Sequence, residues 1–265
     1  MSTLRILNLN IWNYNPPWPE RRSRIVELIH DTQPDLVALQ EIRYHDWLPY
    51  PTHQAGQILA GLDGYHHIWR PAHYWAPGHG DNHGQTCWEG LAILSQQPIV
   101  DQAHARLSRD LDDPRDAHQR IVLGAQIQTP AGPFWLFDTH YPLGADARAR
   151  VAVETHEFVR QTAGDRPFCL TGDFNAQPDE FPIRFLSGQT EVDGQTGALV
   201  DAWRVAHPTE PGHTFPAWGP ARRIDYLWLS PTVQVESLAV VGSVPNRETI
   251  SPSDHCGLLA VVKLQ

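Results

Sequence analysis

The chain has 265 residues, 41% hydrophobic and 19% charged, so it can bury a multilayer core and is not globally disordered. Its formal net charge of −10, with Lys263 as the single lysine, excludes a general attraction to nucleic acid or anionic lipid, although a local arginine cluster could still bind phosphate. Three cysteines without C-x-x-C spacing argue against a disulfide framework and against a structural zinc site.

A strand, a helix and a second strand are predicted at the start of the chain. The apolar run 4–9 predicts a strand that ends near Asn10. Apolar residues at helical spacing predict a helix over 21–32, which closes before Pro34. Residues 35–41 predict a buried strand that ends in an acid. This alternation is typical of an α/β fold.

Residues 45–86 show no sustained periodicity beyond a short helix near 57–62 and a strand near 65–70, so we predict a long loop region. Its aromatic residues and Trp88 could form a lipid-binding patch, stack on a base or pack the loop. Seven histidines there match no metal-ligand spacing, which favours a surface loop over a second metal site. The histidines are His45, His53, His66, His67, His73, His79 and His83, and the aromatic residues are Trp47, Trp69, Tyr74 and Trp75.

The remaining two thirds of the chain alternate between predicted strands and one long helix, at about 145–162. No linker, low-complexity tract or close repeat divides the chain, so we expect residues 1–265 to form a single catalytic domain. With no secretion signal and no stretch of about 18 apolar residues, we expect a soluble cytoplasmic protein. The predicted strands lie at 90–95, 120–128, 134–139, 168–170, 223–229, 235–241 and 257–262.

Polar residues stand at or beside the ends of these strands, where an apolar residue would pack better. Any one of them could merely cap a turn or end its strand, but a shared explanation of that kind is improbable for nine. In α/β sheets, the carboxyl ends of the strands are where sites assemble. The nine are Asn10, Glu41, Glu89, His140, Asp173, Asn175, Asp225, Asp254 and His255.

The motifs that hold these residues, in their order along the chain, resemble those of the endonuclease/exonuclease/phosphatase superfamily. The resemblance covers residues 9–255, and the motifs are specific together, although each is weak alone. It implies an α/β fold in which two mixed β-sheets pack face to face, with helices on both outer sides, as a four-layer sandwich. The motifs are Leu9-Asn10-Ile11-Trp12, Leu39-Gln40-Glu41, Trp88-Glu89-Gly90, Asp138-Thr139-His140, Gly172-Asp173-Phe174-Asn175, Arg223-Ile224-Asp225-Tyr226 and Ser253-Asp254-His255.

The resemblance implies a metal-dependent phosphoester hydrolase that uses Mg²⁺, with Mn²⁺ as a possible substitute. Mg²⁺ takes oxygen ligands and keeps several waters, so one or two carboxylates suffice. By resemblance, Glu41 is the principal ligand, Asn10 supports the same site, and Asp254 contributes directly or through water.

The same resemblance implies roles for the other site residues. Asp173 orients or deprotonates the attacking water, and Asn175 holds a phosphate oxygen. His255 binds the phosphoryl group, and Asp225 fixes its imidazole. His140 is a second phosphate-contacting histidine, with Glu89 as its carboxylate partner in the deoxyribonuclease I branch of the family.

The substrate is less well specified than the reaction. The acidic composition favours a small or lipid-like phosphodiester or phosphomonoester over a nucleic acid. A DNA or RNA nuclease is the alternative, and a non-catalytic binding module on the same fold is a third reading. Membrane lipid and nucleic acid therefore both stay open as partners, and no protein partner is implied.

Overall fold

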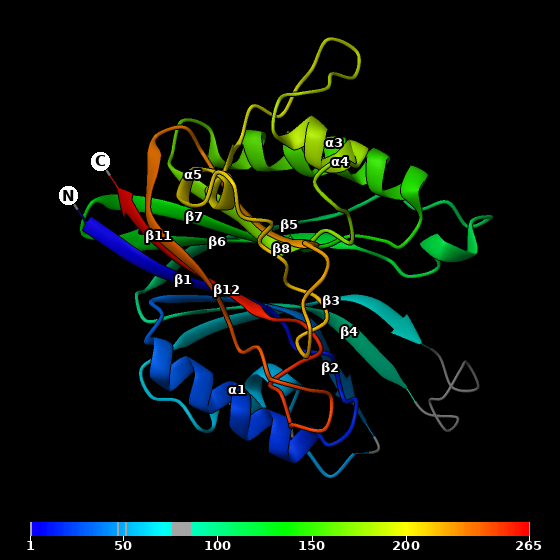
Figure 1. The fold of residues 1–265 in the computed structure, drawn as a ribbon, viewed down its shortest axis with the longest axis vertical. Coiled ribbons are helices and arrows are strands. Elements are labelled where there is room, and N and C mark those ends of the chain that lie inside the picture. Colours follow the sequence, from blue (N-terminus) through cyan, green and yellow to red (C-terminus); the bar gives the residue numbers. More distant parts are fainter. Residues whose placement is uncertain (1, 47, 51, 76–85, 265) are drawn as a thin grey trace.

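The protein forms four layers, seen edge-on in the computed structural model of Figure 1. Two six-stranded sheets lie in the middle, and helices cover the outer face of each. The structure describes residues 2–46, 48–50, 52–75 and 86–264. The predicted four-layer α/β sandwich is confirmed.

The first sheet has the strand order β11-β12-β1-β2-β4-β3. Its single parallel pair is β1 with β2, and helix α1 (Trp18–Thr32) makes the crossover between them. The buried Ile25 and Ile29 pack α1 onto the sheet. The strands are β1 (Ser2–Asn10), β2 (Leu36–His45), β3 (His66–Trp75), β4 (Cys87–Ser95), β11 (Val233–Val241) and β12 (Gly257–Leu264).

The second sheet has the order β5-β6-β7-β8-β10-β9 and repeats this plan. Its parallel pair is β7 with β8, joined by helix α3 (Ala145–Ala163). The strands are β5 (Ile99–Arg106), β6 (Ile121–Thr129), β7 (Gly132–His140), β8 (Phe168–Asp173), β9 (Val200–Asp201) and β10 (Asp225–Leu229).

Three apolar clusters fill the spaces between the layers. One lies between the two sheets, with Ile93, Leu123 and Leu136 among its fully or almost fully buried members. The second lies between the second sheet and its helices, and the third between the first sheet and its helices. The shorter helices are α2 (Gln54–Leu59), α4 (Phe181–Leu186) and α5 (Ala202–Ala206), with a 3₁₀ turn at Pro114–Asp116.

Residues 45–86 contain more regular structure than the sequence predicted. Helix α2 lies three residues earlier than expected, and β3 is a ten-residue edge strand paired along its length with β4. Residues on both faces of β3 are half-buried or exposed, so the apolar alternation that marks a strand is weak. Trp47, His79 and His83 lie outside the described residues.

Several other elements were not predicted, namely β5, β9, α4 and α5. Strand β5 is an edge strand with alternating exposed residues, and the other three are six residues or shorter. Within the described part of the chain, no helix is both long and apolar enough to cross a membrane.

Candidate active site

Strand register brings the predicted site residues of the second sheet into one row. His140 of β7 lies opposite Asp173 of β8, and Asp173 lies opposite Asp225 of β10. Gly172 makes this approach possible, because its φ is +146° and an added Cβ would lie 2.0 Å from the Thr139 carbonyl oxygen. The three side chains therefore come from neighbouring strand ends.

A β-bulge turns Glu41 toward this row. The pairing of β2 with β4 shifts between Leu39 and Ile42, and Glu41 has a left-handed φ of +59°. Asn10 Nδ2 then donates to Glu41 Oε1 at 3.2 Å and to Asp173 Oδ2 at 3.1 Å. Asn10 thus links the two sheets at the site and positions both carboxylates.

Asn13 belongs to the same arrangement, although the sequence analysis did not single it out. Its Nδ2 donates to Glu41 Oε2 at 2.7 Å. The only sequence signal is an asparagine in the loop that follows β1, three residues after Asn10, and asparagine is common in any loop.

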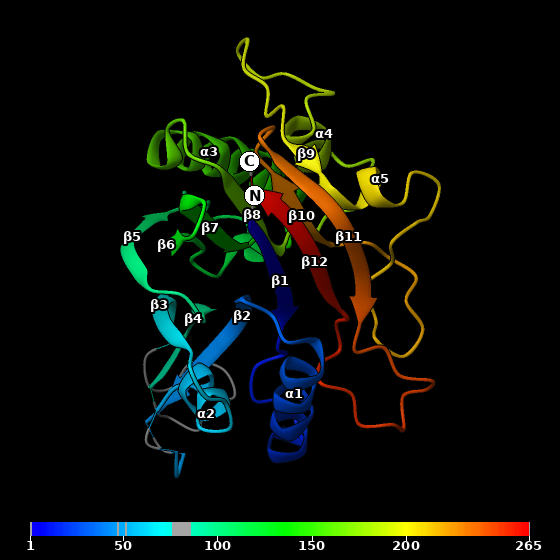
Figure 2. The same cartoon turned by 90° about the vertical axis from the view of Figure 1, so that its left-hand side faces the viewer.

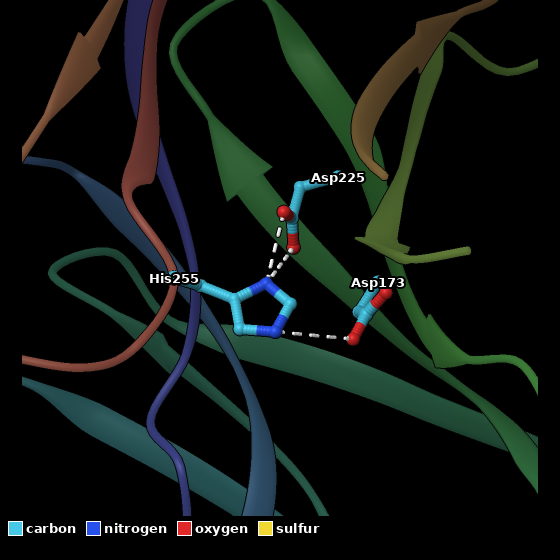
Figure 3. A group of neighbouring side chains, drawn as sticks. All are labelled: Asp173, Asp225 and His255. Carbon is cyan, nitrogen blue, oxygen red and sulfur yellow. Dashed lines mark hydrogen bonds and ion pairs between the residues drawn. The ribbon is translucent and has the colours of Figure 1, made fainter. Parts of the chain in front are cut away.

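His255 lies between two buried carboxylates, as Figure 3 shows. Its Nδ1 is 3.0 Å from Asp225 Oδ2, and its Nε2 is 3.7 Å from Asp173 Oδ2. Burial lowers the pKa of His255, but Asp225 and Asp173 outweigh it and raise that pKa to about 10. His255 is therefore an imidazolium near neutral pH, held by Asp225, which in turn accepts from Thr214 Oγ1.

The side chains of Asp173, Asp225 and His255 lie close enough together to hold a metal ion. Each ring nitrogen of His255 already faces a carboxylate, however, and a protonated imidazole has no free nitrogen lone pair for a cation. The oxygen ligands of Glu41 and Asp254 are the better candidates for a cation.

Asp173 presents each carboxylate oxygen to a different set of partners. Oδ1 accepts the Asn175 backbone N–H at 2.9 Å. Oδ2 faces Asn10, His140 at 3.5 Å and His255, so three donors converge on one oxygen. Burial raises the pKa of Asp173 to about 6 even though His255 acts to lower it. Near neutral pH the group is mainly a carboxylate that can accept a proton.

Asn175 directly follows this strand end, with a left-handed φ of +50°. Its Nδ2 donates to the Tyr141 carbonyl oxygen at 3.0 Å. The amide is thereby anchored next to Asp173.

His140 is a neutral hydrogen-bond donor, because Arg120 fixes its tautomer. Arg120 Nη1 lies 2.9 Å from His140 Nδ1, and a guanidinium can only donate. Nδ1 must therefore accept, which leaves the proton on Nε2, the nitrogen that faces Asp173. Burial, followed by Arg120 and His255, holds the pKa of His140 well below its usual range.

Glu89 does not pair with His140 in the way the family resemblance implied. Its carboxylate lies 2.7 Å from Arg43 Nε and 3.6 Å from Arg120 Nη1, so Arg120 stands between Glu89 and His140. Burial raises the pKa of Glu89, but the two arginines outweigh it and lower that pKa. Glu89 is buried and ionised, and acts on His140 through Arg120.

Replacement of Arg120 should disturb His140 without removing it. We expect Arg120→Met to lower turnover about tenfold or more, because the His140 proton is then free to move to Nδ1. The ¹⁵N shifts of His140 should report Nε2–H in the parent protein and a changed tautomer or protonation state in the variant. Arg120→Lys, which keeps a donor, should restore part of the turnover. Lost turnover with unchanged His140 shifts would contradict this role.

Glu41 and Asp254 are carboxylates close enough for the charge of Glu41 to act on Asp254, and carboxylate oxygens suit a hard divalent cation. Burial and then the neighbouring charge of Glu89 raise the pKa of Glu41. Burial raises the pKa of Asp254 to about 6, with Glu41 also acting to raise it. The raised pKa values mean that the ionised form of each carboxylate is disfavoured, and a bound cation would stabilise that form. Carboxylate oxygens are ligands that suit Mg²⁺ or Mn²⁺.

Arg21 organises the turns beside these carboxylates and was also not predicted. It is only 1% exposed, and burial lowers its pKa to about 10 although the charges of Asp254 and Glu41 act to raise it. It fastens the loop after β1 to the loop before β12. The carbonyl oxygens that accept from its guanidinium belong to Ile11, Trp12, Asn13, Asn15 and Pro252.

The described histidines and aromatic residues of 45–86 mostly pack against one another. The ring centroids of His53 and Trp69 are stacked 4.4 Å apart, and those of Trp88 and Tyr74 are 5.5 Å apart. Trp75 lies 4.3 Å from His73. Tyr74 is half exposed. Packing of the region, the third of the readings open from the sequence, fits these contacts.

Comparison with known proteins gives consistent matches. The model of the Endonuclease/Exonuclease/phosphatase family matches residues 7–255. The chain is 24% identical over 230 residues to a Caenorhabditis elegans protein named "Putative neutral sphingomyelinase", covering 78% of this chain and 47% of that protein. The chain thus spans about half the length of this relative.

Solved structures share the fold over the whole chain. An endonuclease/exonuclease/phosphatase from Bacteroides vulgatus matches with a TM-score of 0.75 at 23% identity, covering 100% of both chains. A mannosyl-6-phosphatase of Bacteroides thetaiotaomicron matches with a TM-score of 0.73 at 20% identity, covering 98% of this chain and 100% of that one.

Proposed function

The chain belongs to the endonuclease/exonuclease/phosphatase family, and from this premise we propose that it hydrolyses phosphoester bonds. We propose a divalent-cation-dependent attack by an activated water on a small or lipid-like phosphodiester or phosphomonoester. The observation that carries the proposal is the convergence of Asn10, His140 and His255 on one oxygen of Asp173.

Asp173 is proposed to accept the proton of the attacking water. Its pKa of about 6 leaves it deprotonated at neutral pH yet basic enough to take a proton. The donors around Oδ2 stand at 3.1 to 3.7 Å, longer than a tight hydrogen bond, and such contacts often tighten only with substrate bound.

His255 and His140 are proposed to hold the phosphoryl oxygens. His255 contributes a positive charge, and His140 contributes a neutral N–H whose direction Arg120 sets. Asn175 adds an amide at the same strand end. Donors already held by Asp225 and Arg120 need no reorganisation as negative charge develops on the phosphoryl group.

Glu41 and Asp254 are proposed to hold Mg²⁺, or Mn²⁺ in its place, with Asn10 keeping Glu41 in position. When bound, the ion would polarise a phosphoryl oxygen or stabilise the leaving oxygen.

A small or lipid-like substrate remains preferred over nucleic acid. Arg43 and Arg120 beside the site are already paired with Glu89, and Arg223 is buried in an ion pair with Asp201. Such arginines have little charge left for a polyanion. The relative named as a sphingomyelinase supports a lipid-like phosphodiester, and a DNA or RNA nuclease is the alternative.

We also propose that residues 1–265 form one catalytic domain, because both sheets contribute site residues. Glu41 and Asn10 come from the first sheet, and His140, Asp173 and Asp225 come from the second. A cytoplasmic location is part of the proposal and fits the three cysteines, which are buried and unpaired.

Removal of divalent cations should abolish hydrolysis. We expect purified protein to cleave a generic aryl phosphodiester or aryl phosphate with Mg²⁺ or Mn²⁺, to lose this activity in a chelator, and to regain it when cation is added. Glu41→Gln should need far more cation, because one carboxylate ligand is lost.

The same assay separates the substrate classes. Single-stranded DNA, duplex DNA, RNA, sphingomyelin and small phosphoesters are offered under identical conditions. Full activity after exhaustive chelation would contradict the cation requirement. Cleavage of nucleic acid with no turnover of small or lipid esters would favour the nuclease instead.

A further inference from the structure

A pocket walled by two tryptophans adjoins the Glu41 end of the site. Its volume is about 240 Å³, and its lining includes Trp12, Pro17, Trp218, Arg247 and Ile250. Two larger surface hollows, lined from residues 65–68 with 99–102 and from residues 178–205, share no residue with this pocket or with the site.

Three separate segments of the chain build the pocket: the turn after β1, the loop before β10 and the loop between β11 and β12. The last of these lies beside α1 in both Figure 1 and Figure 2. The Trp12 and Trp218 rings lie 6.2 Å apart at 51°. Arg21 Cζ lies 5.1 Å from the ring centroid of Trp12, and Arg247 Cζ lies 5.2 Å from that of Trp218. The wall therefore presents the two indoles and the exposed guanidinium of Arg247, while Arg21 is buried.

The pocket is joined to the proposed metal ligands by short links. The Trp12 backbone N–H donates to Asn10 Oδ1 at 3.0 Å, and the side-chain amide of the next residue, Asn13, donates to Glu41. On the other wall, the Ser251 hydroxyl donates to the Ser253 carbonyl, one residue before Asp254. The pocket walls and the residues that hold or carry the proposed metal ligands therefore lie in the same two loops, after β1 and before β12.

Indole and guanidinium surfaces bind rings by stacking, because both are flat and the guanidinium adds charge. Pockets for drug-sized ligands usually measure roughly 300–1,000 Å³, so about 240 Å³ suits one ring and is too small for the chains of a lipid. The charged and hydroxyl groups at Arg247, Glu248 and Thr249 suit a ring that carries polar substituents.

We propose that this pocket binds a single polar ring in the alcohol part of the phosphoester, as a nucleoside or a sugar would provide. The inference rests on the proposed function and narrows its substrate from small or lipid-like to ring-bearing. Trp218 is then a specificity residue, placed outside the catalytic group.

Trp218→Ala tests the pocket. The substrates are a nucleoside, a hexose and a glycerol phosphoester, each as the monoester and as the methyl diester, with Mg²⁺ present. The parent protein should prefer a ring ester over the glycerol ester. In Trp218→Ala, kcat/KM for that ring ester should fall roughly ten- to hundredfold while the glycerol ester is unaffected, because one stacking surface is lost. Trp218→Phe should restore most of the preference.

Comparison of the nucleoside and hexose esters decides which source supplies the ring. Tyr74→Ala, which removes a half-exposed aromatic side chain from edge strand β3, is the control and should leave the preference unchanged. Equal losses for ring and glycerol esters in Trp218→Ala, or no ring preference in the parent protein, would overturn the inference.

Calorimetric titration of the same ring and glycerol phosphates into the Asp173→Asn protein separates the two proposals. Ring-dependent binding that weakens in the Asp173→Asn, Trp218→Ala double variant supports the pocket even where no ester is turned over. If the parent protein hydrolyses none of the esters but ring binding is intact, the result counts against the proposed function alone. If the parent protein hydrolyses the esters without ring selectivity, the result counts against the pocket alone.

Discussion

Asp173→Asn should lower phosphoester hydrolysis about 10³-fold or more while the fold stays intact. A general base typically contributes about 10²- to 10⁴-fold, and the amide cannot accept the proton of water. The size of the side chain is preserved, so the contacts with Asn175 and Asn10 lose charge but little packing. Steady-state kinetics with Mg²⁺ on a small aryl ester would measure the loss.

The pH profile gives a second measurement of the same role. The base must be deprotonated, and its pKa is raised to about 6, so parent activity should fall as pH drops through about 6. The residual activity of Asp173→Asn should lack this limb. Asp165→Asn, an exposed carboxylate before the opposite end of β8, is the matched control and should behave like the parent. Near-normal turnover of folded Asp173→Asn would exclude Asp173 as the base.

His255→Ala should also reduce hydrolysis by orders of magnitude, about 10²- to 10³-fold for the loss of one donor to developing charge. The variant removes the imidazolium and leaves Asp225 and Asp173 without their shared cation in a buried site. Some loss of stability is therefore expected, and circular dichroism must show that the protein assayed is folded. His30→Ala on the exposed face of α1 serves as the control.

Asp225→Asn tests the same group with less disturbance to packing. Asp225 is the charge that raises the pKa of His255 most, so without it that pKa should fall from about 10. Activity that depends on the imidazolium should then be lost at a lower pH than in the parent protein. A pH profile that does not move on the alkaline side would contradict the role of charged His255.

The sequence alone indicated the α/β fold class because it depends on local patterns, whereas the proposed reaction came from the family resemblance of the motifs. Apolar runs and helical spacing marked most of the central strands and both crossover helices, and polar residues at the ends of these strands marked the site. The edge and short elements escaped because they bury little apolar surface. Strand β3, exposed or half-buried along its length, is the longest of these.

The two crossover units show why polar residues at strand ends come together in the fold. In β1-α1-β2 the first strand ends at Asn10 and the second carries Glu41, and in β7-α3-β8 the strands end at His140 and Asp173. Parallel strands joined by a helix align their carboxyl ends, so residues about thirty positions apart become neighbours. A pattern read along the chain is sufficient to predict this convergence within each unit.

Contacts across the two units were decided only by the tertiary structure. Packing of the two sheets brings Asn10 to Asp173, and the loops bring Arg120 to His140 and Arg21 to the turns beside Glu41. The Trp12 and Trp218 pocket arises in the same way, from segments about two hundred residues apart. A sequence specifies which side chains stand at the ends of its strands, but tautomer, charge state and ligand pocket depend on distances between segments that only the folded chain sets.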